Sequence, residues 1–255
     1  MDEFQLLVDL HKGAQRQGPG GDAETRRAIQ LSGLDPEAPL RIADIGCGTG
    51  ASTLVLASVL KHARITAVDF LPEFLDALME RARIAGVAGR ITPVCASMED
   101  LLLGEGELDG IWSEGAIYNI GFARGVAEWR RYLKPGGLLM ASEITWLTPT
   151  RPGEIQAYWE GEYPEIDLPS AKMRVLEENG YSPIGYFVLP EHCWLEHYYR
   201  PMQSGFAAFL QRNGHSAQAR ALVEAERREM ELYERFRTYY SYGVYLARKA
   251  CEDAP

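Results

Sequence analysis

A seven-residue segment, 44–50, carries the pattern in this chain that most clearly indicates binding chemistry. It has glycine at positions 46, 48 and 50, directly after an acidic residue. Glycine permits positive φ and has no Cβ, so such a backbone turns sharply and lets a ligand approach it closely. A turn that holds no ligand rarely requires three glycines. The segment therefore predicts a binding loop.

The flanking residues predict how this loop is held. Residues 40–45 form an apolar run typical of a buried strand, and residues 51–60 are typical of a helix. A glycine-rich turn between a strand and a helix lies beyond the strand's carboxyl end, which is where open α/β sheets bind nucleotides. The ligand is thus expected at one edge of a parallel sheet.

Two classes of ligand fit the loop. Gly46-x-Gly48-x-x-Ala51 matches the degenerate dinucleotide pattern, whereas Asp44-x-Gly46-x-Gly48-x-Gly50 resembles motif I of the class I S-adenosylmethionine (SAM) methyltransferases. The carboxylate of Asp44 favours the second, because it would repel a pyrophosphate and attract the ammonium group of SAM. The resemblance therefore implies SAM as cofactor, with S-adenosylhomocysteine (SAH) as its product.

A second acid follows at the expected distance. Residues 64–70 predict a strand, and Asp69 near its end lies 19 residues after Gly50, about where such folds place the carboxylate that bonds both ribose hydroxyls. Asp69 also suits the N-cap of a helix over residues 71–85, in which Pro72 fits the first turn. The two roles are compatible.

The third predicted strand, residues 90–95, is followed by a segment that resembles the adenine-binding part of these enzymes. Ser97 stands where many relatives have Asp, and Met98 would flank the adenine ring and offer a backbone amide. An alternative interpretation of Met98 is ordinary core packing.

Further landmarks complete the resemblance. Residues 108–114 predict the fourth strand, 115–120 an active-site loop, 125–133 a helix that ends at Lys-Pro-Gly-Gly (134–137), and 138–144 the fifth strand. Over residues 40–145 the order of these motifs is similar to that in the class I methyltransferases. The sequence of the glycine loop is most similar to that of the methyltransferases of ubiquinone and menaquinone biosynthesis and their small-molecule relatives. The implied fold is α/β and Rossmann-like: a mostly parallel seven-stranded sheet with an antiparallel C-terminal hairpin and a helical cap.

The resemblance also implies a set of cofactor-binding residues. They come from the glycine loop, the ends of the next three strands and a glycine-rich N-terminal turn: Asp44, Gly46, Cys47, Gly48, Thr49, Gly50, Asp69, Phe70, Ser97, Met98, Ser113, Gln17 and Gly18.

The implied reaction is in-line attack on the methyl group of SAM, which requires an aligned acceptor and, for some acceptors, removal of a proton. Glu114, after the fourth strand, is the first candidate acid, with contact to the amino-acid end of the cofactor as an equal alternative. Tyr118 and Asn119 are candidates to orient the substrate, and Glu143, at the end of the fifth strand, is the third catalytic candidate.

The remaining chain predicts one domain over residues 1–255 with added segments. Residues 1–39 form an N-terminal cap whose turn at 16–21 is either a linker or a cover for the cofactor. Insertions are expected at 147–169, a lid rich in Pro, Trp and Tyr, and at 190–239, with a charged helix near 215–237 whose charges indicate a solvated face. With strands at 181–189 and 240–248, these segments predict a mostly enclosed, aromatic-lined cavity, although each aromatic residue could equally serve in packing.

Composition narrows the function. The net charge of −10 disfavours nucleic acid as a partner, and an Asn-Pro-Pro-Tyr motif is absent after the fourth strand. No metal is expected, because the four cysteines form no C-x-x-C and His192 and His197 are spaced weakly for a site. Without a long apolar run or signal peptide, no membrane association and a cytoplasmic location are expected. The oligomeric state stays open.

The predicted function is methyl transfer to a small molecule. The alternatives are an RNA or protein methyltransferase, a SAM-binding protein without catalysis, or a nicotinamide oxidoreductase.

Overall fold

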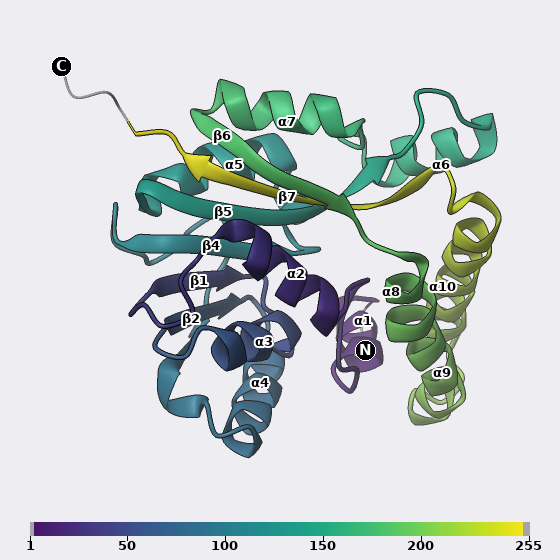
Figure 1. The fold of residues 1–255 in the computed structure, drawn as a ribbon. Coiled ribbons are helices and arrows are strands. Elements are labelled where there is room, and N and C mark those ends of the chain that lie inside the picture. Colours follow the sequence, from purple (N-terminus) through teal and green to yellow (C-terminus); the bar gives the residue numbers. More distant parts are fainter. Residues whose placement is uncertain (1–2, 252–255) are drawn as a thin grey trace.

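A computed structural model describes residues 3–251, which form a seven-stranded sheet with helices on both faces (Figure 1). The strand order is β3-β2-β1-β4-β5-β7-β6, with β7 antiparallel to both of its neighbours and the other pairs parallel. The strands are β1 (Arg41–Ile45), β2 (Arg64–Asp69), β3 (Ile91–Cys95), β4 (Leu108–Glu114), β5 (Leu133–Trp146), β6 (Tyr181–Val188) and β7 (Tyr240–Lys249). The predicted fold class is confirmed.

Helices cover the sheet in two layers. The α-helices are α1 (Glu3–His11), α2 (Asp22–Ser32), α3 (Ala51–Val59), α4 (Pro72–Ile84), α5 (Phe122–Trp129), α6 (Gly153–Glu162), α7 (Pro169–Glu178), α8 (Glu191–Trp194), α9 (Arg200–Arg212) and α10 (Ala217–Phe236). One apolar core contains residues of α2, α3 and α4, and a second contains residues of α5 and α7. No helix in the described part of the chain is long and apolar enough to cross a membrane.

The central strands are buried on both faces, as parallel strands between two helical layers must be. Ile42, Ala43 and Ile45 of β1 are each at most 1% exposed. The turn after β1 therefore has a fixed position. It lies beside the ends of β2 and β4, which pair with β1 in parallel register.

The junction between α5 and β5 differs from its prediction. The helix begins earlier, at Phe122, and the Lys-Pro-Gly-Gly segment lies within β5 instead of before it. The register of β5 against β4 shifts between Leu108 and Gly110. A local bulge of this kind absorbs the turn residues without ending the strand.

The segment 147–169 is not the lid that its composition predicts. It contains α6, whose Ile155 and Trp159 are buried, and Glu154 of α6 pairs with Arg235 of α10. Trp159 packs edge-on against Tyr240 at 5.3 Å between ring centroids. Only Ile155, Trp159 and Ile166 of this segment are buried, and they anchor it to the core on one side.

Most of the predicted aromatic wall is likewise core. Trp194 stacks on Tyr233 at 4.5 Å and also contacts Tyr199, Tyr240 and Tyr242. Trp112 and Trp146 are at most 2% exposed. The packing interpretation of these residues is confirmed.

Candidate active site

A cavity of about 630 Å³ lies at the carboxyl ends of β1, β2 and β4, between the sheet, the N-terminal segment and α10. Its volume is in the range of small-molecule and cofactor sites. It brings together twelve of the predicted site residues: Gln17, Gly18, Gly46, Cys47, Gly48, Asp69, Phe70, Ser97, Met98, Glu114, Tyr118 and Asn119.

The glycine loop has the predicted positive φ angles, but packing within the protein, and not only the approach of a ligand, requires its glycines. Gly46, Gly48 and Gly50 have φ of 71°, 53° and 87°. A Cβ at Gly46 would overlap Ala116, and one at Gly50 would overlap Leu78. Positive φ and close packing within the protein thus require these glycines, whatever ligand the loop binds.

The backbone N–H groups of the loop are already used inside the protein. Those of Gly46 and Cys47 donate to Val68 O, and that of Gly50 donates to Cys47 O. A pyrophosphate-binding loop needs such groups free to face the phosphates.

The two remaining amides of the loop are also engaged. Gly48 N donates to Asp69 Oδ2 at 2.8 Å, and Thr49 N donates to Gln17 Oε1 at 3.0 Å. The amides of residues 46–50 are therefore not free for phosphate groups, which favours a cofactor without phosphate at this loop.

Asp69 lies in the cavity with both carboxylate oxygens oriented by backbone. Oδ2 accepts from Gly48 N and Oδ1 accepts from Leu71 N at 3.0 Å. The N-cap of α4 is Leu71 and not Asp69, so the predicted N-cap role of Asp69 is wrong. Burial raises the pKa of Asp69. Each oxygen keeps a lone pair, so a diol can still donate to this carboxylate.

Asp44 is buried below the loop and does not line the cavity. Its Oδ2 accepts hydrogen bonds from Ser52 and Thr53, while Oδ1 is buried and has no hydrogen-bond partner among the described residues. Burial raises the pKa of Asp44 to about 7. Asp44 was predicted to contact a cofactor ammonium, but its carboxylate instead accepts from two hydroxyls in the first turn of α3 and so holds that turn to β1.

Three further candidates also lie outside the cavity. Thr49 bonds the N-terminal segment, Gly50 packs on Leu78, and Ser113 is fully buried in β4. Side chains alternate along a strand, so Ser113 faces the opposite way from its neighbour Glu114.

Glu143 was predicted as a catalytic candidate, but it does not lie at the cavity. Its carboxylate pairs with Lys172 Nζ at 3.2 Å, and the two side chains are 0% and 4% exposed. Burial raises the pKa of Glu143 to about 7, and the Lys172 charge opposes that shift. This ion pair joins β5 to α7 and does not line the cavity.

Glu114 lines the cavity and accepts hydrogen bonds from three side chains, Arg16, Thr25 and Trp112, a group that we call the Glu114 hub. Its Oε2 accepts from Arg16 Nη1 at 3.2 Å, and its Oε1 accepts from Thr25 Oγ1 at 2.6 Å and Trp112 Nε1 at 3.0 Å. Arg16 also pairs with Asp22. These contacts join β4 to the N-terminal cap.

Arg16 lines the cavity and was not among the predicted site residues. Its side chain is 10% exposed, lines the cavity and carries donors suited to a carboxylate. Its position in the sequence gave a weak signal. Arg16 precedes Gln17 in a glycine-rich turn, and that composition is typical of a linker unless the turn folds over the cavity.

Gln17 fastens that turn to the glycine loop. Its Oε1 accepts from Thr49 N, and its Nε2 donates to His11 O, Ala14 O and Thr49 Oγ1. Residues 16–19, which we call the strap, thereby line the cavity. Of the two alternatives for the turn at 16–21, a linker or a cover for the cofactor, this position favours the cover.

Gln17→Ala should loosen the strap. The variant loses several neutral hydrogen bonds worth about 0.5–1.5 kcal/mol each, so SAH affinity should fall by about three- to tenfold. Titration calorimetry measures the change, with limited proteolysis at the strap as a second readout. Gln15→Ala, an exposed neighbour, is the matched control. Equal affinity and equal proteolysis in both variants would show that the strap does not cover the site.

The adenine-side candidates Ser97 and Met98 both line the cavity after β3. Met98 O accepts from Trp129 Nε1 at 3.2 Å, which fixes this segment against α5. Phe70, also in the lining, is 64% exposed. An exposed ring at a cavity edge is available to cover a flat ligand.

A second group of residues that was not predicted lines the side of the cavity formed by α10. Glu226 and Glu229 lie there with Tyr198, and His11 Nε2 is 3.9 Å from Glu226 Oε1. Burial, with the neighbouring Glu226 charge, raises the pKa of Glu229 to about 7. We call Glu226 and Glu229 the acidic wall.

A sequence signal for the acidic wall does exist. Leu222, Glu226, Glu229 and Tyr233 recur at four- and three-residue intervals, so they share one face of α10. Acids in the middle of an apolar helical stripe indicate a buried site. Treating all charges of this helix as solvated was wrong for these two.

The roof of the cavity also differs from the prediction. It is formed by α1 and the strap together with α10, and no residue of 147–169 is in the described lining. Phe4 and Tyr118 on its rim are 54% and 44% exposed, so the cavity is more open than predicted.

Comparison with known proteins agrees with this geometry. Residues 42–137 match a family model described as a methyltransferase domain. The chain is 35% identical over 125 residues to a malonyl-[acyl-carrier protein] O-methyltransferase of Laribacter hongkongensis, covering 47% of this chain and 42% of that protein. It is 31% identical over 136 residues to a ubiquinone/menaquinone biosynthesis C-methyltransferase of Geobacter, covering 52% and 56%. The chain thus spans about half the length of these curated relatives.

The fold has close counterparts among solved structures. A SAM-dependent methyltransferase of Geobacter sulfurreducens, solved with SAH, superposes with a TM-score of 0.81 at 18% identity over 96% of both chains. Residues 42–137 thus match the methyltransferase domain model, and the sheet that contains them has the same fold as this solved SAM-dependent methyltransferase. The resemblance found in the sequence is confirmed.

Proposed function

We propose that the chain is a SAM-dependent methyltransferase that acts on a small molecule. The observation that carries the proposal is the glycine loop, whose backbone amides are all engaged within the protein while Asp69 remains in the cavity beside it. This arrangement suits a cofactor that offers a diol and no phosphate at the loop.

The lining residues fit such a cofactor. Asp69 would accept from the ribose hydroxyls, and Met98 and Phe70 would contact the base. Arg16 has five N–H donors and bonds Glu114 and Asp22, so its remaining N–H groups would be the donors for a carboxylate. When bound, SAM supplies a methyl group on a positively charged sulfur, which an aligned nucleophile can remove. The strap and α1 lie over this part of the cavity and restrict the access of water.

The acceptor side of the cavity favours a positively charged molecule. Five of the described residues that line the cavity as a whole carry carboxylates, namely Asp69, Glu99, Glu114, Glu226 and Glu229. Asp69 is assigned above to the ribose and Glu114 is paired with Arg16, which leaves Glu226 and Glu229 for the acceptor. The acidic wall, with the Tyr198 ring beside it, can bind an ammonium group through charge and ring contacts. The same acidity disfavours an RNA acceptor, whose phosphates it would repel.

The direct test is methyl transfer from labelled SAM to a panel of small amines, hydroxy compounds and thiols, with bulk RNA as a further acceptor. The expected result is label in an acceptor that bears a positive group. Labelling of RNA alone would show that the alternative acceptor class is correct. Absence of transfer despite SAH binding would favour a SAM-binding protein without catalysis.

Glu229 gives this acceptor preference a pH dependence. Its pKa of about 7, raised from 4.5, means that its charge forms as the pH rises through neutrality. Binding of a permanently charged quaternary ammonium probe should therefore strengthen by about tenfold from pH 6 to pH 8, since the ionised fraction rises from about 0.1 to 0.9. Isothermal titration with SAH present measures it.

Glu229→Gln should abolish that pH dependence and weaken the binding of the probe at pH 8. Glu231→Gln, on the exposed side of α10, is the matched control and should behave as wild type. A carboxyl whose folded pKa exceeds its unfolded value costs stability above that unfolded value. The Gln variant should therefore unfold at the same or a higher temperature at pH 8. Retained pH dependence in Glu229→Gln would exclude the assignment.

A further inference from the structure

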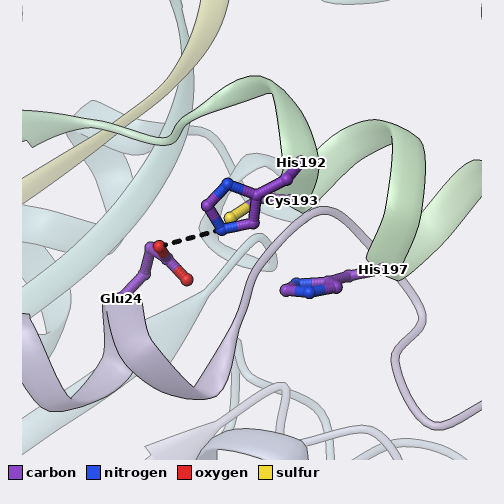
Figure 2. A group of neighbouring side chains, drawn as sticks. All are labelled: Glu24, His192, Cys193 and His197. Carbon is purple, nitrogen blue, oxygen red and sulfur yellow. Dashed lines mark ion pairs between the residues drawn. The ribbon is translucent and has the colours of Figure 1, made fainter.

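Four side chains with metal-binding atoms converge where the N-terminal cap meets the 190–239 insertion (Figure 2). Glu24 comes from α2, His192 and Cys193 come from α8, and His197 comes from the turn that follows. One ligand atom from each lies within 4.8 Å of all the others. Figure 2 shows His192 and His197 on the same side of Glu24, with the Cys193 sulfur beside the His192 ring.

A local irregularity of the helix creates this convergence. Residues five apart on an α-helix differ by about 140° around its axis, so His192 and His197 would normally face different directions. Here Leu195–Tyr199 forms a π-helical turn, which is wider and aligns residues at that spacing. The two imidazole rings consequently lie 5.1 Å apart between centroids. Short π-helical turns occur frequently at functional sites.

One carboxylate oxygen of the cluster lacks a hydrogen-bond donor among the described residues, and a cation could occupy that position. Glu24 Oε2 is buried and has no hydrogen-bond partner among the described residues, while Glu24 Oε1 is 3.2 Å from His192 Nε2. His197 Nδ1 is 2.8 Å from Gly20 O. A histidine that donates from one ring nitrogen to a carbonyl keeps the other nitrogen free as a metal ligand.

The ligand chemistry matches zinc. Two imidazoles, one thiolate and one carboxylate are all zinc ligands, and the two anionic ligands neutralise a dication. Zinc bond lengths of about 2.0–2.3 Å place tetrahedral ligand atoms about 3.3–3.8 Å apart. The observed spacing within 4.8 Å requires a contraction of about 1 Å, which the half-exposed His192 can supply.

We propose that Glu24, His192, Cys193 and His197 form a structural zinc site. Four protein ligands complete a tetrahedral shell and leave no open position for a substrate, so the ion would serve as a cross-link. It would join α2 to α8. Thr25, next to Glu24, donates to Glu114, so the cross-link would also hold the Glu114 hub.

Metal analysis of the purified protein tests this site directly. Wild type should contain about one zinc per chain, and a chelator should lower its melting temperature in a way that added zinc reverses. His192→Ala, a change at a half-exposed residue, should lose the zinc and its thermal effect while remaining folded. His62→Ala, an exposed histidine away from the cluster, is the matched control and should keep both.

Cobalt substitution identifies the sulfur ligand. Wild type titrated with Co²⁺ should develop a thiolate-to-metal absorption band and the intense visible bands of tetrahedral cobalt, whereas Cys193→Ser should lack the thiolate band. Cys95→Ser, at an exposed thiol, should retain it. The proposal is wrong if wild type binds no zinc, or if His192→Ala binds as much zinc as wild type. These readouts do not depend on SAM or on turnover.

Discussion

Asp69→Ala should lower the affinity for SAH by at least about tenfold. The change removes a carboxylate that lies in the cavity and is positioned to accept from a ribose diol. Hydrogen bonds to charged groups contribute about 1.5–3 kcal/mol each, and 1.4 kcal/mol corresponds to tenfold in affinity. The variant also leaves Gly48 N without its acceptor at the centre of the glycine loop. Titration calorimetry measures the loss.

Two further variants separate binding from folding. Asp69→Asn keeps an acceptor oxygen and should lose less affinity than the alanine variant. Asp76→Ala, at an exposed position of α4, should bind SAH as wild type does. If Asp69→Ala is folded by circular dichroism and binds SAH with unchanged affinity, Asp69 does not contact the cofactor.

Glu114→Gln should destabilise the protein by about 2 kcal/mol and weaken SAH binding. It removes the charge that partners Arg16, and both side chains are at most 14% exposed. Removing one member of a buried ion pair leaves the other charge without compensation, which is costly even where a second acid such as Asp22 remains. Denaturant unfolding measures stability, and calorimetry measures SAH affinity.

A double-mutant cycle with Arg16→Gln isolates the contact itself. The two changes should be less than additive, with a coupling of about 1–2 kcal/mol in the free energy of unfolding. Glu107→Gln is the matched control, because its partner Arg41 forms an ion pair about half exposed on both sides, worth at most about 1 kcal/mol. Additive effects of Glu114→Gln and Arg16→Gln would show that the hub does not join the strap to the sheet.

The fold and the cofactor side of the site follow closely from the sequence because local patterns specify them. Strand, glycine loop and helix are contiguous over residues 40–60, and parallel register then brings Asp69 and Glu114 to the same edge. The roof could not be predicted in this way. Whether α1, α6 or α10 covers the edge depends on which apolar faces pack together, and composition assigned that role to α6 although its Trp159 belongs to the core.

The residues that were missed depend on long-range or irregular structure. Arg16 acquires its role through a contact with Glu114, 98 residues away. His192 and His197 meet only because Leu195–Tyr199 forms a π-helical turn, which spacing alone did not reveal. Glu226 and Glu229 were visible as acids within an apolar stripe, but the sequence does not show that their face of α10 lines the same cavity as residues of α1 and of the strand ends.

Parallel calorimetric titrations with SAH and with NADH test the central claim most directly. The loop amides are engaged within the protein and Asp69 lies in the cavity, so a cofactor with a diol and no phosphate should bind there. We expect one SAH per chain at micromolar or tighter affinity and no heat from NADH. NADH binding at the same site, or no binding of SAH to the folded protein, would contradict the assignment of this cavity to SAM.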